Sequence, residues 1–176
     1  MKLLTLKFFI IFIYLISSSI SYAIQQPSYK NLLVHKEPIK LKKIAFYNLK
    51  NEIIDLSKYK NSLILINFWA TWCKPCKEEM PSLNRLKTNI NFKNLVILPI
   101  NVGREDISKL KLFFDELNIN NLEIFFDNTN NLANNFSLIG LPTTILINKH
   151  NEEFARILGP INFDDNKFIE WLKNYD

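Results

Sequence analysis

Residues 63–81, LILINFWATWCKPCKEEMP, contain the transition on which the fold depends: an apolar run, two cysteines and the start of a charged segment. The first part, residues 63–68, is apolar apart from one asparagine and has the length of a strand, which is typical of a central strand covered on both faces. Apolar residues then recur every three or four positions, which predicts an amphipathic helix that begins near Cys73. These apolar residues are Met80, Leu83, Leu86 and Ile90.

The two cysteines of the chain, Cys73 and Cys76, lie where the predicted strand gives way to the predicted helix. The free N–H groups and the macrodipole at a helix start stabilise a thiolate, and they can lower a thiol pKa from about 8.5 toward about 7. Cys73 is therefore the predicted nucleophile. Cys76 lies one helical turn further on, close enough to attack a mixed disulfide on Cys73 and release the bound partner. Pro75 fits the first turn, where its missing N–H costs no hydrogen bond.

Two other interpretations of the cysteine pair stay open. A purely structural disulfide between such close residues would constrain the unfolded chain little, by about 2 kcal/mol on the chain-entropy relation. A closed zinc site needs four ligands, and the sequence has no second cysteine pair. Copper could be held by both cysteines and one histidine, His35 or His150, in a copper-delivery module. Of the three, the residues favour thiol–disulfide exchange most.

The N-terminus has the features of a secretory signal peptide. Lys2 and Lys7 precede an apolar run, and small polar residues lead to Ala23, after which we expect cleavage. The charge-free stretch, residues 8–24, is shorter than the roughly 20 apolar residues of a membrane span. We therefore expect an exported, periplasmic protein, soluble after cleavage of residues 1–23 and membrane-anchored if they are retained.

Beyond the predicted signal peptide, residues 24–40 are polar, contain two prolines and show no period, which predicts a linker before one domain at residues 41–176. That domain alternates predicted strands and helices, which indicates a mixed sheet with helices on both faces. The predicted elements are hairpins at 44–56 and 143–158, strands at 63–68, 95–100 and 124–126, and helices from about 73 and around 107–117, 132–136 and 168–175.

Composition and charge exclude several classes of protein. The chain has 176 residues, is 48% hydrophobic and carries a net charge of +5, which describes an ordinary globular domain. A charge this weak and scattered does not predict nucleic-acid binding. With only three glycines, the sequence forms neither a phosphate-binding loop nor a dinucleotide fingerprint. The absence of H-E-x-x-H and G-x-S-x-G motifs excludes zincin-type and nucleophile-elbow hydrolases.

The segment Asn67–Pro81 resembles the active-site segment of the TlpA/ResA branch of the thioredoxin superfamily, whose members are exported thiol–disulfide oxidoreductases. The resemblance extends from about Leu41 to the C-terminus. It implies an α/β, thioredoxin-like fold of three layers, with a central mixed sheet flanked by helices, an N-terminal hairpin and a helix–strand insertion near residues 104–127. It also implies a redox-active Cys73–Cys76 disulfide, with no other cofactor and no metal.

The same resemblance gives roles to residues around the cysteines. Pro142 would be a cis-proline that faces the pair and presents the backbone of Leu141 to an extended target peptide. Trp72 would cover the sulfurs. Glu79 is the expected proton carrier of the exchange, because Asn67, where many thioredoxins have a buried aspartate, cannot carry a proton. The predicted substrate-binding residues are Trp72, Pro75, Leu141 and Pro142.

The predicted function is the reduction of disulfides in client proteins, with the oxidised enzyme recharged by a membrane thiol carrier. The clients that the resemblance implies are apocytochromes c, through their haem-attachment cysteines, or proteins with copper-ligand cysteines, in cytochrome c or cytochrome oxidase biogenesis. An oxidant that forms disulfides is a second interpretation, and the copper-delivery module is a third.

Overall fold

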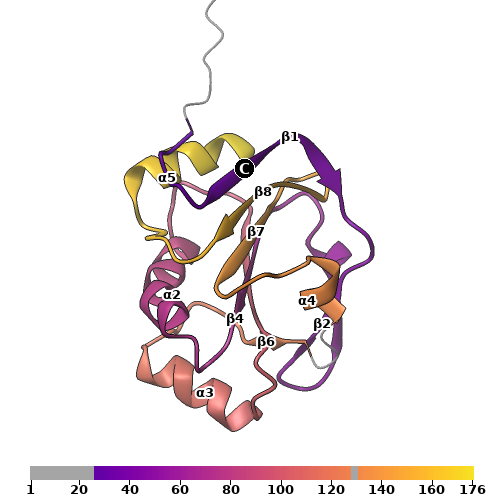
Figure 1. Ribbon diagram of the computed structural model, residues 1–176, viewed down its shortest axis with the longest axis vertical. Coiled ribbons are helices and arrows are strands. Elements are labelled where there is room, and N and C mark those ends of the chain that lie inside the picture. Colours follow the sequence, from indigo (N-terminus) through magenta and orange to yellow (C-terminus); the bar gives the residue numbers. More distant parts are fainter. Residues whose placement is uncertain (1–25, 128–130) are drawn as a thin grey trace, which may run out of the picture.

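The computed structural model describes residues 26–127 and 131–176, and the predicted signal peptide, residues 1–23, lies outside this part. Strands and helices alternate along the described chain (Figure 1). The strands are β1 (Leu32–Lys40), β2 (Ala45–Asn48), β3 (Ile53–Asp55), β4 (Leu63–Trp69), β5 (Leu95–Asn101), β6 (Phe125–Phe126), β7 (Thr143–Ile147) and β8 (Glu152–Leu158). The helices are α2 (Lys74–Lys87), α3 (Ile107–Glu116), α4 (Asn131–Asn135) and α5 (Asn166–Leu172), with 3-10 turns η1 (Leu56–Tyr59) and η2 (Lys173–Tyr175). Among the described residues, no helix is long and apolar enough to cross a bilayer.

The strands form one mixed sheet in the order β1-β8-β7-β4-β5-β6-β2-β3. β4 is central: it runs parallel to β5 and antiparallel to β7, and all seven of its residues are buried, as its apolar sequence predicts. Both predicted hairpins are present, because β2 pairs with β3 and β7 pairs with β8, each antiparallel.

Helices cover both faces of the sheet, which confirms the predicted three layers. In Figure 1, α2, α3 and α5 lie on one side of the central strands and α4 lies on the other. Alternate residues of β4 point to opposite faces. Leu63, Leu65 and Trp69 belong to the core under α2, α3 and α5, and Ile64, Ile66 and Phe68 belong to the core under α4.

Two stretches differ from the sequence prediction. The predicted linker over residues 24–40 is wrong in its second half, because residues 32–40 form β1 at the edge of the sheet. β1 pairs with β8, and its register shifts between Val34 and Ile39, so its exposed residues follow no regular alternation. The predicted helical stripe ends at Leu86, since α2 stops at Lys87 and leaves Ile90 97% exposed.

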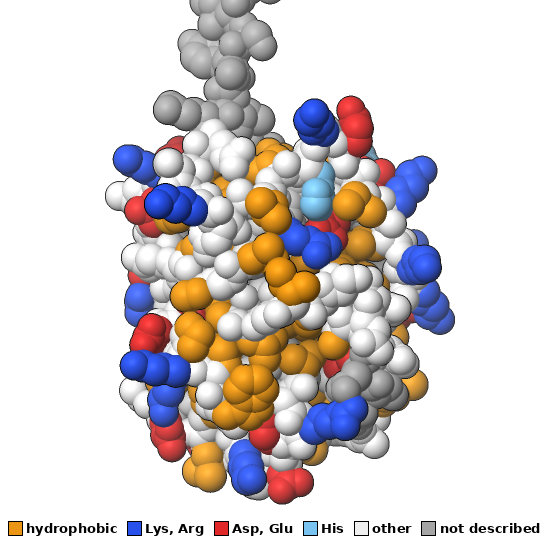
Figure 2. Space-filling model, viewed as in Figure 1, with side chains coloured by type: hydrophobic (Ala, Val, Ile, Leu, Met, Phe, Trp, Pro, Cys, Tyr) orange, Lys and Arg blue, Asp and Glu red, His pale blue; other side chains and the backbone are white. Residues whose placement is uncertain are grey.

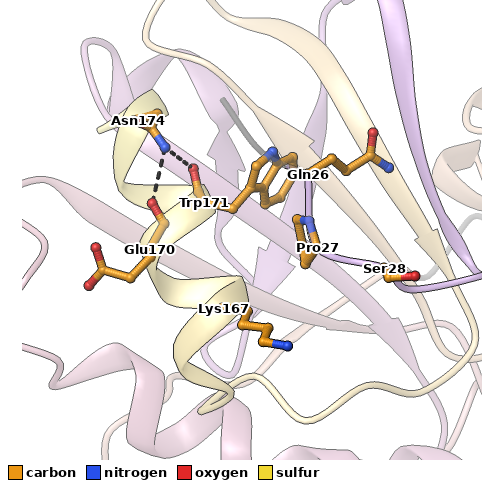
Figure 3. A pocket seen from close by; sticks show the side chains of 7 residues that line it. All are labelled: Gln26, Pro27, Ser28, Lys167, Glu170, Trp171 and Asn174. Carbon is orange, nitrogen blue, oxygen red and sulfur yellow. Dashed lines mark hydrogen bonds between the residues drawn. The ribbon is translucent and has the colours of Figure 1, made fainter. Parts of the chain in front are cut away.

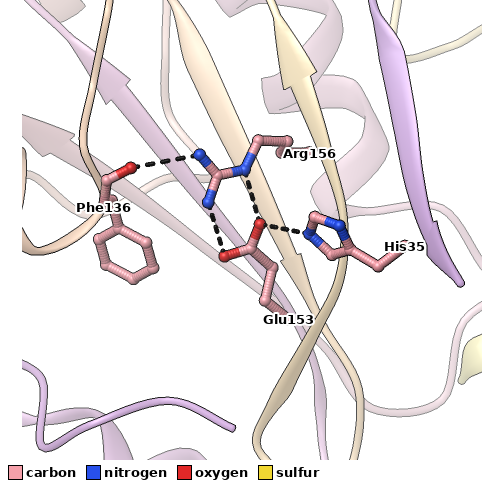
Figure 4. Close-up of polar contacts among 4 residues, drawn as sticks. All are labelled: His35, Phe136, Glu153 and Arg156. Atoms are coloured by element: carbon pink, nitrogen blue, oxygen red, sulfur yellow. Dashed lines mark hydrogen bonds and ion pairs between the residues drawn. The ribbon is translucent and has the colours of Figure 1, made fainter. Parts of the chain in front are cut away.

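A largely buried ion pair attaches β1 and α4 to β8 (Figure 4). Glu153, which is 2% exposed, lies 2.8 Å from His35 Nε2 on β1. Its two carboxylate oxygens also accept hydrogen bonds from Nε and Nη2 of Arg156, at 2.7 and 2.9 Å. Arg156 Nη1 then donates to the carbonyl oxygen of Phe136, the residue that follows α4. The cluster therefore joins three elements that are distant in sequence.

Two further surface features are visible in the figures. Figure 2 shows apolar side chains gathered in the middle of one face, with charged side chains mostly around its rim. Figure 3 shows a pocket between residues 26–28 and α5, where Asn174 Nδ2 donates to the carbonyl oxygens of Glu170 and Trp171. None of the predicted site residues lines this pocket.

Candidate active site

The cysteine pair lies at the junction of β4 and α2, where the sequence predicts it. Cys73 and Cys76 form a disulfide, with their Cα atoms 5.3 Å apart. Cys73 caps α2, because the backbone N–H of Cys76 donates to Cys73 Sγ at 3.3 Å, and Pro75 lies in the first turn. The helix start thus directs a backbone donor at the sulfur of Cys73, an arrangement that favours negative charge on this atom.

The two cysteines differ in their access to solvent. Cys73 is 4% exposed and Cys76 is fully buried, so only Cys73 reaches the surface in this oxidised state. The adjacent Trp72 is 69% exposed and is not part of the core. A partner that approaches from solvent therefore meets Trp72 and the edge of Cys73 before it can meet Cys76.

Glu105 holds the loop that precedes the cysteines. The backbone N–H and the hydroxyl of Thr71 both donate to Glu105 Oε1, at 2.8 and 2.6 Å. The contact joins residues 34 positions apart, and it arises because β5 lies beside β4, with Trp69 opposite Asn101. Glu105 is not predicted from the sequence, because no local pattern connects it to the cysteines.

The Leu141–Pro142 peptide bond is cis, as the resemblance implies. Thr143, the first residue of β7, pairs with Phe68 on β4, so Pro142 lies at the same end of the sheet as the cysteine loop. The carbonyl oxygen of Pro142 accepts a hydrogen bond from Gly159 N–H at 2.8 Å. Leu141 is half-buried and contacts both cores of the domain.

Glu79 is a buried carboxyl group on the inner side of α2, with 3% exposure. Asn67 Nδ2 donates to Glu79 Oε1 at 2.7 Å, and Ile161 N–H donates to Glu79 Oε2 at 3.3 Å. Burial raises the pKa of Glu79 from 4.5 to about 8, against the opposing effect of these two hydrogen bonds. Because Cys76 and Glu79 are three residues apart on one helix, they lie on neighbouring turns of the same face.

The structure does not bring either histidine to the cysteines. His35 lies on β1, three strands away from β4, and contacts Glu153. His150 lies in the turn between β7 and β8, at the opposite end of β7 from Thr143. In the part of the chain that the structure describes, no three His, Cys, Asp or Glu side chains group as a metal site would need. The copper-delivery interpretation gains no support from this arrangement.

Comparison with known proteins agrees with this site. Residues 37–152, well over half of the chain, match the AhpC/TSA family. The chain belongs to the AhpC/TSA family. The thiol–disulfide oxidoreductase ResA of Geobacillus kaustophilus is 32% identical over 127 residues, which are 72% of this chain and 72% of that protein. ResA of Bacillus cereus is 26% identical over 163 residues, 90% of this chain and 91% of that protein. This member of the AhpC/TSA family is therefore a thiol–disulfide oxidoreductase, and the predicted resemblance and enzyme class are confirmed.

Solved structures of other proteins share the fold. A thiol:disulfide interchange protein of the thioredoxin family from Chlorobium tepidum superposes with a TM-score of 0.66 at 20% identity, over 80% of this chain and 98% of that one. A secreted thiol-disulfide isomerase from Corynebacterium glutamicum gives a TM-score of 0.69 at 21% identity, over 88% of this chain and 98% of that one. These similarities confirm the thioredoxin-like fold.

Proposed function

We propose that the protein reduces disulfides in exported client proteins, with Cys73 as the nucleophile and Cys76 as the resolving thiol. The observation that carries this proposal is the unequal placement of the two sulfurs. Cys73 is the only one that reaches the surface, and it receives a backbone N–H from the start of α2. Cys76 lies beneath it, on the turn before a buried carboxyl group.

The exchange proceeds in two displacement steps. The thiolate of Cys73 attacks one sulfur of a client disulfide, and the other client sulfur leaves as a thiolate. Glu79 then accepts the proton of Cys76, whose thiolate attacks Cys73 Sγ and displaces the second client thiolate. Two electrons have moved to the client, and the Cys73–Cys76 disulfide that results is the state described above. A thiol carrier in the membrane would reduce this disulfide again.

The proposed setting is the periplasm or cell exterior, and the proposed clients are apocytochromes c or proteins with copper-ligand cysteines. Two observations support export: the sequence of residues 1–23 has the features of a signal peptide, and the relative from Corynebacterium glutamicum is described as secreted. A reductant is needed in such compartments, because they are oxidising and would otherwise keep client cysteines in disulfides.

A client trap tests this function. The reduced protein is mixed with an oxidised peptide that contains a C-x-x-C-H haem-attachment motif, and peptide thiols are quantified. We expect Cys73→Ser to abolish reduction, and Cys76→Ala to accumulate a mixed disulfide between Cys73 and the peptide, visible by mass spectrometry. A Cys73→Ser protein that reduces the peptide at the native rate would overturn the proposal.

The reduction potential of the cysteine pair tests the direction of electron flow. A value near that of thioredoxin, about −270 mV, supports a reductant. A value near about −120 mV, as in strong disulfide-forming proteins, would show that the protein is an oxidant instead. The measurement is an equilibration of the pair with glutathione buffers, read by alkylation of the free thiols.

A further inference from the structure

The hydrogen bonds around Glu79 show how its carboxyl group is oriented. We propose that Asn67, fixed by Thr144, is a positioning residue that keeps the Glu79 carboxyl group able to lose and regain a proton during exchange. The proposal rests on the role proposed above for Glu79, and it adds two residues to which the sequence analysis gave no part in the proton transfer.

The geometry of the amide supports this role. Asn67 on β4 and Thr144 on β7 are cross-strand neighbours, and Glu79 faces them from α2. Asn67 Nδ2 donates one hydrogen to Glu79 Oε1 at 2.7 Å and one to Thr144 Oγ1 at 2.9 Å. Exposure is 0% for Asn67, 1% for Thr144 and 3% for Glu79, so water screens these contacts little. Both N–H groups of the amide are thereby used.

The packing of β4 gives Asn67 no other reason to be polar. Leu63, Leu65 and Trp69 are the other residues of the strand on this face, and all are apolar. Asn67 Oδ1 is buried and has no hydrogen-bond partner among the described residues. A buried unpaired oxygen is unfavourable, so an apolar side chain would suit the core better. The side-chain amide of Asn67 is oriented so that its NH2 group, and not its oxygen, faces Glu79. This orientation leaves the oxygen unpaired.

The donors counteract the effect of burial on the carboxyl group. Both hydrogen bonds described for the Glu79 carboxyl group are donated to its oxygens, by Asn67 and by Ile161 N–H, and such bonds stabilise the ionised form. Without these donors the pKa of Glu79 would lie still higher, and a smaller fraction of the carboxyl groups would be ionised and able to accept a proton near neutral pH. The other charged residues that line the pocket beside Glu79 are Glu78 and Arg85 of α2, and Arg85 Nε is paired with Asp164 at 2.6 Å.

The test is a titration of the Glu79 carboxyl carbon by NMR in four variants. In Asn67→Leu, which has a similar branched shape but no donor, we expect the pKa of Glu79 to rise by about one unit or more, as loss of a charge-assisted hydrogen bond requires. Thr144→Val should raise it less, and Thr144→Ser, which retains the hydroxyl, should restore the wild-type titration. Thr143→Val is the matched control: Thr143 is equally buried, but its hydroxyl bonds Gly140 O, and Glu79 should titrate as in the wild type.

A second readout links the titration to chemistry. The rate at which the reduced protein reduces oxidised glutathione is measured against pH, and the profile of Asn67→Leu should move to higher pH by the same interval as the pKa. Wild-type titration of Glu79 in a folded Asn67→Leu protein would overturn the proposal. If Asn67→Leu does not fold, Thr144→Val decides: a raised pKa that Thr144→Ser reverses supports the proposal, and an unchanged pKa overturns it. Neither negative result affects the proposed function, whose own tests are the activity of Cys73→Ser and the reduction potential of the cysteine pair.

Discussion

Trp72 and Cys73 are adjacent in the chain but have opposite environments. The indole of Trp72 is 69% exposed, whereas Cys73 is 4% exposed. A large apolar side chain in solvent contributes little to folding, because its apolar surface is not removed from water. Beside the one sulfur that reaches the surface, such a side chain offers a client a rigid apolar contact, which is the role that the sequence analysis gave to Trp72.

Trp72→Ala separates these two contributions. We expect the free energy of unfolding to change by no more than about 0.5 kcal/mol, as for other exposed positions. The rate of reduction of the haem-attachment peptide should fall by about tenfold, the size of an interface contact worth about 1.4 kcal/mol. Reduction of oxidised glutathione, which is too small to need the contact, should be unchanged. Ile90→Ala is the matched control, because Ile90 is 97% exposed and follows the far end of α2; equal losses in both variants would contradict the role of Trp72.

At the residue scale, the sequence predicts those parts of the site that are close together in the chain. Cys73, Pro75 and Cys76 form one helical turn, so their spacing alone indicates their chemistry. Glu79 was assigned by resemblance, but its burial depends on partners 12 and 82 positions away. Contacts of this kind are set by which strands and loops meet, and a periodic pattern contains no such information. The same limit explains why the part of Glu105 in holding the cysteine loop was missed.

At the scale of elements, the continuous apolar run of β4 predicts a central strand, and the three- or four-residue spacing of apolar residues in α2 predicts a helix. β1 was missed because it lies at an edge, contains a register shift and has mostly exposed residues, so burial imposes no pattern on it. Besides its backbone pairing with β8, β1 is joined to β8 and to the residue after α4 by the cluster of His35, Glu153 and Arg156, with Phe136 O (Figure 4). No local sequence pattern predicts that cluster, since its members come from three elements.

Glu153→Leu tests how much this cluster contributes to the free energy of unfolding. The substitution leaves Arg156 largely buried without its carboxylate, and we expect a loss of about 2 to 3 kcal/mol in the free energy of unfolding, measured by urea denaturation. Adding Arg156→Met should recover most of the loss, because it removes the unpaired charge. The exposed pair Lys77–Glu116 provides the control, and Glu116→Gln should cost less than about 1 kcal/mol. Equal effects of Glu153→Leu and Glu116→Gln would show that the cluster has no special part in attaching β1.

At the scale of the whole molecule, the buried carboxyl group of Glu79 makes stability depend on pH. Its pKa in the folded protein, about 8, is above the ordinary value of 4.5. Between these two values the folded state binds a proton that the unfolded state has lost. Raising the pH through this window therefore destabilises the fold, which is the opposite of what a carboxylate with a lowered pKa does.

We expect this group to lower the free energy of unfolding of the oxidised protein by about 1 kcal/mol per pH unit between about pH 5 and 8, and its contribution to be constant above its folded pKa. Other groups titrate in the same range, so the quantity to compare is the difference between the wild type and Glu79→Gln, measured by urea denaturation at each pH. The amide introduced by this substitution is permanently neutral and keeps an oxygen that can accept from Asn67, so the stability of the variant lacks this pH dependence.

The free energy of unfolding of the wild type should fall relative to that of Glu79→Gln as the pH rises. Only the wild type has a carboxyl group here that stays protonated in the folded state after it has ionised in the unfolded state. A difference that stays constant across this range would mean that the carboxyl group is already ionised in the folded protein. The pKa of Glu79 would then lie too far below neutral pH for this group to accept the proton of Cys76 efficiently, and the second displacement step would need another base.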